Sequence, residues 1–243
     1  MKRLLLSVVL TAAVSLAVAQ TPERNVLSSY RIVPVPGKDA QLRKALMEHA
    51  AKYHNGQWKW RIFQVLSGPD EGAYQVNEGT NSWTELEGRK EISDEHQRDY
   101  EKNVLPLSEK TLPAAFLTYQ KDYSSDSAGG PLRKALLRHY YLKPGKGGRV
   151  AAYLANWKKV YEKIGMKVGV WGSFFSGQPQ LVTSFRLANG WADLEKNWGK
   201  LTRETYDELF GTGAYIRYVE DLDSYVERVV EEMIEFLPEV SPK

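Results

Sequence analysis

One stretch of this chain occurs twice, and that repeat constrains the fold more than any other sequence feature. Three landmarks recur in order: Pro36-Gly37-Lys38 as Pro144-Gly145-Lys146, Ser67-Gly68 as Ser176-Gly177, and Trp83–Glu87 as Trp191–Glu195. The offset is 108 residues at the first and third landmarks and 109 at the second. A repeat that keeps its spacing indicates one supersecondary unit that has been copied.

Hydrophobic patterning predicts the order strand, helix, strand, strand, helix, strand for the first copy. β-branched and aromatic runs predict strands at 29–35, 58–66, 73–77 and 114–120. The helix after Asp39 carries an apolar stripe that includes His49, and Ser82 with Glu85 has the spacing of a capping box. Residues 93–110 are polar and predicted to be helical. This order is that of the ferredoxin-like unit.

The second copy follows the same plan. We expect strands at 135–143, 167–176 and 180–187, with helices that begin near Gly147 and Gly190. The last segment, 229–237, is predicted to be the closing strand, although its apolar spacing also fits a helix. Residues 125–131 are rich in Ser and Gly and predict a linker between the repeats 20–124 and 132–243.

The predicted fold class is α+β, with two tandem ferredoxin-like (βαββαβ) repeats that form an intramolecular dimeric α/β barrel. A ferredoxin-like sheet carries helices on one face only, so its other, apolar face needs a cover. Two copies in one chain can press these faces together. The result is a barrel-like pseudo-dimer within one polypeptide.

The N-terminus predicts export. Residues 1–19 combine the basic Met1-Lys2-Arg3, an apolar run and a closing Ala17-Val18-Ala19, which is typical of a signal peptide. The run is too short for a membrane span. We therefore expect a periplasmic or extracellular protein. Removal of Lys2 and Arg3 leaves 31 basic and 30 acidic residues, a balance that argues against a nucleic-acid partner.

The repeated unit, with Trp at the start of its second helix, resembles the dimeric α/β barrel superfamily. The likeness is greatest to its NIPSNAP-type and antibiotic-biosynthesis-monooxygenase-type members in tandem form, and it covers nearly the whole mature chain. The resemblance implies a choice among cofactor-independent monooxygenases, haem enzymes, haem-handling proteins and members without known activity. Fold analogy alone does not choose among them.

Neither a metal site nor a cofactor is predicted from the motifs. The four histidines include no pair at i, i+4, and His49 and His54 are about 140° apart around a helix, so we expect them to point apart. His49 is expected to pack in its stripe with the ring N–H satisfied. The resemblance leaves open that His49 or His139 is an axial haem ligand. The absence of Cys and of G-x-S-x-G argues against nucleophilic hydrolases.

Aromatic and basic residues on the predicted strands mark a candidate pocket between sheet and helices for a flat, partly apolar molecule. Its predicted ligand-binding residues are Trp60, Arg61, His139, Trp171 and Arg186. The alternative interpretation is an ordinary core whose Arg side chains extend to solvent.

The leading functional prediction is an exported protein that binds a small molecule or a protein partner, with association of further copies left open. One alternative is a cofactor-independent monooxygenase acting on an electron-rich aromatic, with His139 and Tyr141 as catalytic candidates. Another is haem binding. We expect functional residues at positions where the two copies of the repeat differ. These positions are His49 in the first copy and Trp157 in the second, Arg31 and His139, and Ile62 and Trp171.

Overall fold

The computed structural model describes residues 23–90, 92–127, 132–173, 175–196 and 198–242. The predicted signal peptide, 1–19, lies outside the described residues, as does most of the predicted linker. Among the described helices, none is both long and apolar enough to cross a membrane.

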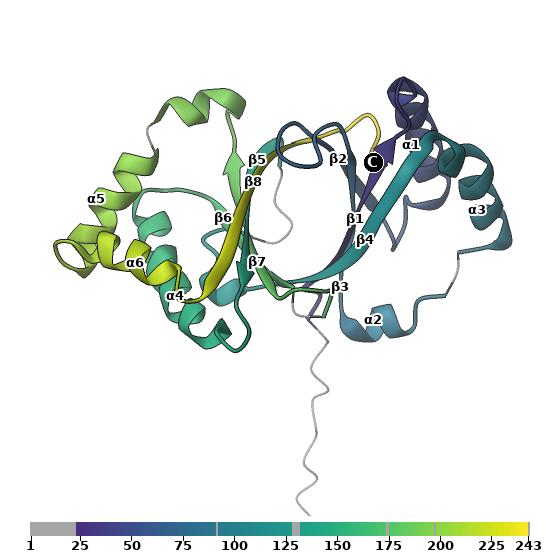
Figure 1. Cartoon of the computed structure of the whole chain (residues 1–243). Coiled ribbons are helices and arrows are strands. Elements are labelled where there is room, and N and C mark those ends of the chain that lie inside the picture. The colour runs from purple at the N-terminus through teal and green to yellow at the C-terminus, as the bar shows by residue number, and fades with distance from the viewer. Residues whose placement is uncertain (1–22, 91, 128–131, 174, 197, 243) are drawn as a thin grey trace, which may run out of the picture.

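Eight antiparallel strands close into a barrel, in the order β1-β3-β2-β8-β5-β7-β6-β4. The strands are β1 (Val26–Pro34), β2 (Trp60–Val65), β3 (Tyr74–Asn81), β4 (Ser108–Tyr119), β5 (Lys134–Leu142), β6 (Val168–Ser173), β7 (Gln180–Leu187) and β8 (Val226–Phe236). The helices are α1 (Asp39–Tyr53), α2 (Trp83–Glu87), α3 (Asp94–Asp99), α4 (Gly147–Lys163), α5 (Trp198–Phe210) and α6 (Ala214–Leu222). The helices of the first half cover one outer side of the barrel, and α4, α5 and α6 cover the opposite side (Figure 1).

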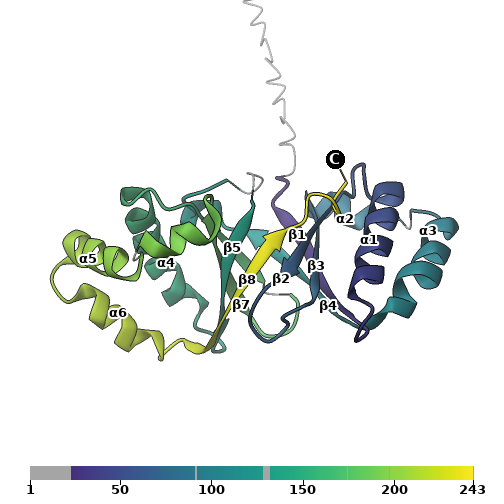
Figure 2. The ribbon, with the colours of Figure 1, turned by 90° about the horizontal axis from the view of Figure 1, so that it is seen from above.

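The two halves have equivalent sheets, which confirms the predicted fold class. Each half contributes four neighbouring strands, in the orders β4-β1-β3-β2 and β8-β5-β7-β6. The closing strand of each half pairs with the second strand of the other, as β4 with β6 and β8 with β2. Figure 2 shows the barrel between the two helical layers. Both sheets thereby lose their free edges.

Two kinds of core hold the barrel together. Outside it, the stripe of α1 buries Leu42, Leu46 and Ala50 against Ile32 and Ile62 of the first sheet. Full burial of an aliphatic side chain of this size contributes about 1.5–3 kcal/mol. Inside it, apolar residues of both halves form a second cluster: Phe63, Val65, Ala73, Ala135, Leu137, Val182 and Ile234. The inner faces therefore do cover each other, as the sequence predicts.

The segment 93–110 differs from the predicted helix. The α-helix ends at Asp99, a π-helical turn spans Tyr100–Val104, and a 3₁₀ turn containing Pro106 leads into β4 at Ser108. Proline cannot donate the next helical hydrogen bond, so the helix does not continue past it. β4 is longer than predicted because its polar first half pairs with β1.

The C-terminal segment is a strand, as predicted, since β8 spans Val226–Phe236 and pairs with β5 along most of its length. The helical segment after Gly190 is longer and more divided than the sequence suggests. A 3₁₀ turn at Gly190–Lys196 precedes α5, and the short Gly211–Gly213 turn separates α5 from α6. Among the described residues, these helices are longer than α2 and α3, which stand at the equivalent place in the first half.

Candidate functional site

Within the described residues, a cavity of about 650 Å³ lies between the outer face of the second sheet and helices α4, α5 and α6. Strand alternation directs Leu136, Arg138 and Tyr140 of β5 outward to form its floor. Its walls come from the facing helices, including Trp157 on α4 and Tyr218 on α6. The volume is in the usual range for small-molecule sites.

Aromatic rings dominate the walls of this cavity. Trp157 stacks on Tyr161 with ring centroids 5.5 Å apart, and Tyr161 meets Phe185 edge to face at 5.7 Å. Tyr218 packs against Trp157 at 5.2 Å. Rings held by one another in this way present fixed flat surfaces, which suit a planar guest.

Charge in the cavity lining is asymmetric. Six basic residues outnumber three acidic ones: Arg133, Lys134, Arg138, Lys167, Arg186 and Lys196 against Asp126, Asp193 and Glu231. Arg138 Nε lies 2.5 Å from Glu231, and Lys196 Nζ lies 2.5 Å from Asp193. Lys134 pairs with Glu235 and Arg186 with Asp126, so the excess that remains in the lining comes from Arg133 and Lys167. This excess of cations favours an anionic group on a ligand.

Two phenols of the cavity, those of Tyr161 and Tyr218, are hydrogen-bond donors rather than bases. Burial raises the pKa of Tyr161 and of Tyr218 well above the ordinary value. Both hydroxyls therefore keep their protons at neutral pH.

Three of the predicted ligand-binding residues meet at a different place. Arg61, Trp171 and Arg186 line a second cavity, of about 350 Å³, in the barrel interior rather than between sheet and helices. Arg186 also lines the larger cavity, and it pairs with Asp126. Trp60 points to the opposite face of β2, where its indole stacks on the His54 ring at 3.6 Å.

His139 and Tyr141 also face the barrel interior, yet neither belongs to the lining of these two cavities. Their rings are 6.5 Å apart. His139 Nε2 lies 2.8 Å from Glu232, and its Nδ1 lies 3.2 Å from the amide oxygen of Gln180. Of the predicted catalytic pair, His139 is thus held in a side-chain network, and Tyr141 stacks beside it.

That network centres on the carboxylate of Glu232. Arg31 Nη1 donates to Glu232 at 2.9 Å and to Asp70 at 2.7 Å. Burial of Glu232 pushes its pKa up, but hydrogen bonds from His139 and Arg31 outweigh burial and hold the pKa at about 2. Arg31 and His139 occupy equivalent positions of the two repeats. The two copies therefore place different residues at this position, and both residues bind the carboxylate of Glu232.

The expectation that His49 and His54 point apart was wrong. α1 ends at Tyr53, and His54 is its C-cap residue with φ −120°, so the helical angle does not apply to it. The two rings converge with His96 of α3 beneath α1. Since His49 and His139 both lie outside the lining of the two cavities, neither is positioned as an axial ligand for a group bound there.

The sequence contained part of the signal for the large cavity. Trp157 and Tyr161 belong to the apolar stripe of the second repeat's first helix, which a core helix explains equally well. The sequence pattern predicts one helix that begins near Gly190 and does not separate α5 from α6. Tyr215, Tyr218 and Leu222, at i, i+3 and i+7, are the feature that could have indicated α6.

Fold and cavity together define the class: a tandem dimeric α/β barrel with a ligand-sized cavity under the helices of its second half. No protein-family model matches the sequence, and no curated protein matches it.

Solved structures share the fold. An anthrone oxidase-like protein matches with a TM-score of 0.55 and 10% identity, over 88% of this chain and 92% of that one. A proposed monooxygenase of Fusobacterium nucleatum subsp. nucleatum matches with a TM-score of 0.54 and 11% identity, over 87% and 92%. A proposed chlorite dismutase matches with a TM-score of 0.51 and 11% identity, over 89% and 96%. Identities this low establish the fold alone.

Proposed function

We propose that the protein binds a flat, partly apolar small molecule that carries an anionic group, in the cavity between β5–β7 and helices α4–α6. The observation that carries the proposal is the combination of fixed aromatic walls with an excess of basic residues in one 650 Å³ cavity. Planar apolar surface would pack on Trp157, Tyr161 and Phe185, while the anion would be drawn to the basic rim.

The protonation states of the phenols and carboxylates that line the cavity favour binding over catalysis. Oxygenation of an electron-rich aromatic without a cofactor needs a base that removes a proton from the substrate. The phenols of Tyr161 and Tyr218 have raised pKa values. The carboxylates of the lining are all paired: Asp126 with Arg186, Asp193 with Lys196 and Glu231 with Arg138. The monooxygenase alternative is supported by the likeness to the proposed monooxygenase and the anthrone oxidase-like protein, and the same cavity would hold its substrate.

We further propose that the chain is a relative of the NIPSNAP-type and antibiotic-biosynthesis-monooxygenase-type tandem barrels that its repeat resembles. We also propose that it acts after export. Sequencing of the N-terminus of the mature protein would test the second point, with Gln20 expected as the first residue.

A pair of fluorescent probes tests the binding proposal. 1-Anilinonaphthalene-8-sulfonate is aromatic and anionic, and N-phenyl-1-naphthylamine has the same rings without the charge. We expect saturable binding of both, with the anionic probe bound more tightly because of the basic lining. Leu136→Trp fills the floor of the cavity without removing a polar contact, and we expect it to weaken both probes at least about tenfold, as loss of roughly 1.4 kcal/mol of binding would.

Arg61→Ala is the matched control, because Arg61 lines only the barrel cavity. We expect it to leave both affinities unchanged. If Arg61→Ala weakens the probes while Leu136→Trp does not, the ligand site is inside the barrel and the proposal is wrong. Consumption of oxygen with anthrone or quinol substrates would instead favour the monooxygenase alternative.

A further inference from the structure

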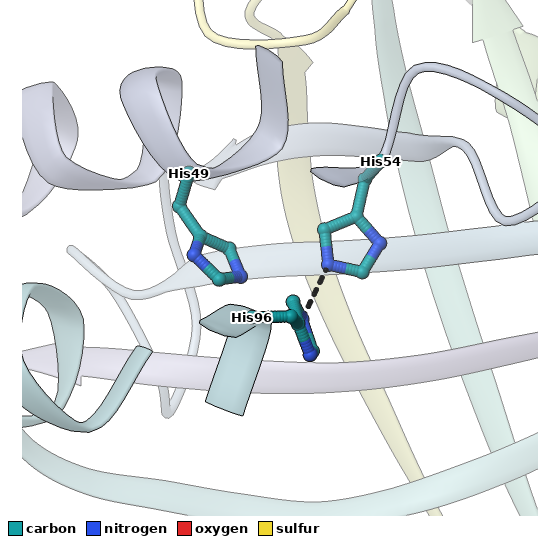
Figure 3. A group of neighbouring side chains, drawn as sticks. All are labelled: His49, His54 and His96. Atoms are coloured by element: carbon teal, nitrogen blue, oxygen red, sulfur yellow. Dashed lines mark hydrogen bonds between the residues drawn. The ribbon is translucent and has the colours of Figure 1, made fainter. Parts of the chain in front are cut away.

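Three buried histidines converge on one point outside the barrel, in the half opposite the large cavity. His49 lies in the last turns of α1, His54 caps that helix, and His96 comes from α3 (Figure 3). One nitrogen from each ring lies within 4.8 Å of the others, and the Nε2 atoms of His54 and His96 are 3.1 Å apart.

Outer partners fix the orientation of two of these rings. His49 Nδ1 donates to the Asp99 carboxylate at 2.7 Å, and His54 Nδ1 donates to the Trp58 carbonyl at 3.1 Å. A carboxylate or a backbone carbonyl on the far nitrogen is the usual outer partner of a metal-bound histidine, because it selects the tautomer and orients the ring. Trp60, stacked on His54, holds that ring further.

The cluster contains more acceptors than its own protons can satisfy. His49 and His54 both donate a hydrogen bond outward from Nδ1. With their protons on Nδ1, both direct an Nε2 lone pair inward, and His96 can donate to at most one of them. His49 Nε2 has no hydrogen-bond partner among the described residues, although the side chain is only 1% exposed. A buried acceptor without a partner is unfavourable.

We propose that His49, His54 and His96 bind one divalent transition-metal ion of the zinc class through their Nε2 atoms. Zinc bonds to imidazole are about 2.0–2.1 Å long, which places tetrahedral nitrogen ligands about 3.3 Å apart. The His54–His96 pair already has nearly this separation, and a nitrogen of His49 lies within 4.8 Å of both. Three histidines leave the fourth position for water or a small ligand.

The donor set and its surroundings determine the kind of ion. Imidazole nitrogen suits Zn²⁺, Cu²⁺ and Ni²⁺, whereas Mg²⁺ and Ca²⁺ prefer oxygen ligands. Rings of Tyr53, Trp60 and Tyr100 lie within 5.4 Å of the His49 ring, so the site has room for a bare ion and not for a large cofactor. The ion would tie α3 to the end of α1.

Metal titration of the full chain tests this proposal. The protein is freed of metal with a chelator and then titrated with Zn²⁺, Co²⁺ or Mg²⁺ during calorimetry. We expect one Zn²⁺ or Co²⁺ per chain, no Mg²⁺ binding, a visible absorption band from tetrahedral Co²⁺, and a rise of several degrees in the melting temperature with Zn²⁺. If the folded wild-type protein binds neither Zn²⁺ nor Co²⁺ stoichiometrically, the proposal is wrong.

Variants locate the ion. His49→Ala and His96→Ala should each abolish stoichiometric binding, whereas His139→Ala should not, because His139 lies in the barrel network. Should the cluster variants fail to fold by circular dichroism, Asp99→Asn serves instead, since its side chain is partly exposed and its loss should weaken Zn²⁺ about 10–100-fold. Equal loss in His139→Ala, or undiminished binding in Asp99→Asn and the folded cluster variants, would refute the assignment.

Discussion

Individual residues of this protein gain their roles from partners far away in the sequence. Arg31 and Glu232 are 201 residues apart and form a buried ion pair, and His139 joins them on the same carboxylate. Because the Glu232 side chain is only 2% exposed, its charge is stabilised by these two partners rather than by water. The network therefore makes stability depend on pH.

The ionisation of Glu232 determines the direction in which stability changes with pH. Its pKa is about 2 in the folded protein and about 4.5 when unfolded, so the ionised form contributes stability above pH 4.5. This contribution, up to about 3 kcal/mol, is lost as the pH falls from 4.5 toward 2. In urea unfolding at a series of pH values, Glu232→Gln should be about 3–5 kcal/mol less stable than wild type at pH 7, and the gap should narrow below pH 4.5.

Glu231 supplies the control for this experiment. It precedes Glu232 on β8, faces the other side of the sheet and pairs with Arg138, with half of its side chain exposed. Exposed pairs of this kind contribute about 0–1 kcal/mol. Glu231→Gln should therefore unfold within about 1 kcal/mol of wild type at pH 7. A pH-independent difference between Glu232→Gln and wild type would contradict the assignment.

At the level of elements, equivalent turns of the two repeats carry different constraints. Gly68, after β2, and Gly177, after β6, occupy the same landmark position in the two copies of the repeat. Both have a positive φ, +98° at Gly68 and +78° at Gly177. A Cβ at Gly68 would lie 2.9 Å from the Cβ of Glu232 and 3.1 Å from the carbonyl oxygen of Glu231, whereas Gly177 has open space. Of the two glycines, only Gly68 packs closely against β8.

We therefore expect alanine at these two turns to have unequal effects. Gly177→Ala should lose about 1–2 kcal/mol of unfolding free energy, the usual penalty for a left-handed alanine. Gly68→Ala adds a backbone collision and should lose at least about 1 kcal/mol more. Equal losses in chemical denaturation would show that the contact between the β2–β3 turn and β8 is not a constraint on the fold.

At the level of the whole molecule, the barrel exists only because each repeat closes the other. The inner face of the first half exposes Phe63 and Val65 when it is separated, and that of the second half exposes Leu137 and Val182. A separate half also has free edges at the strands that otherwise pair across the halves.

Separation of the halves tests this dependence. Residues 20–124 and 132–243, produced as two chains, should each associate with copies of themselves or aggregate. When they are co-expressed they should form a complex with the mass of one intact mature chain. Size-exclusion chromatography with light scattering distinguishes the outcomes. Two halves that stay folded and monomeric alone would show that closure of the barrel is not what stabilises them.

The sequence by itself determined the architecture of this protein. The repeat predicted two halves, and the β-branched and aromatic runs predicted where most strands lie, because such patterns are a local property of the chain. The capping box at Ser82 and Glu85 formed as expected for the same reason.

Only the tertiary structure decided where chemistry can occur. His49, His54 and His96 meet because α1 ends one residue before His54 and because α3 folds back over it, and no spacing rule contains that distance. Arg61 and His139, predicted to line a cleft under the helices, instead face the barrel interior, since closure turns that face of both sheets inward. Contacts between distant segments depend on how elements pack, which local patterns do not encode.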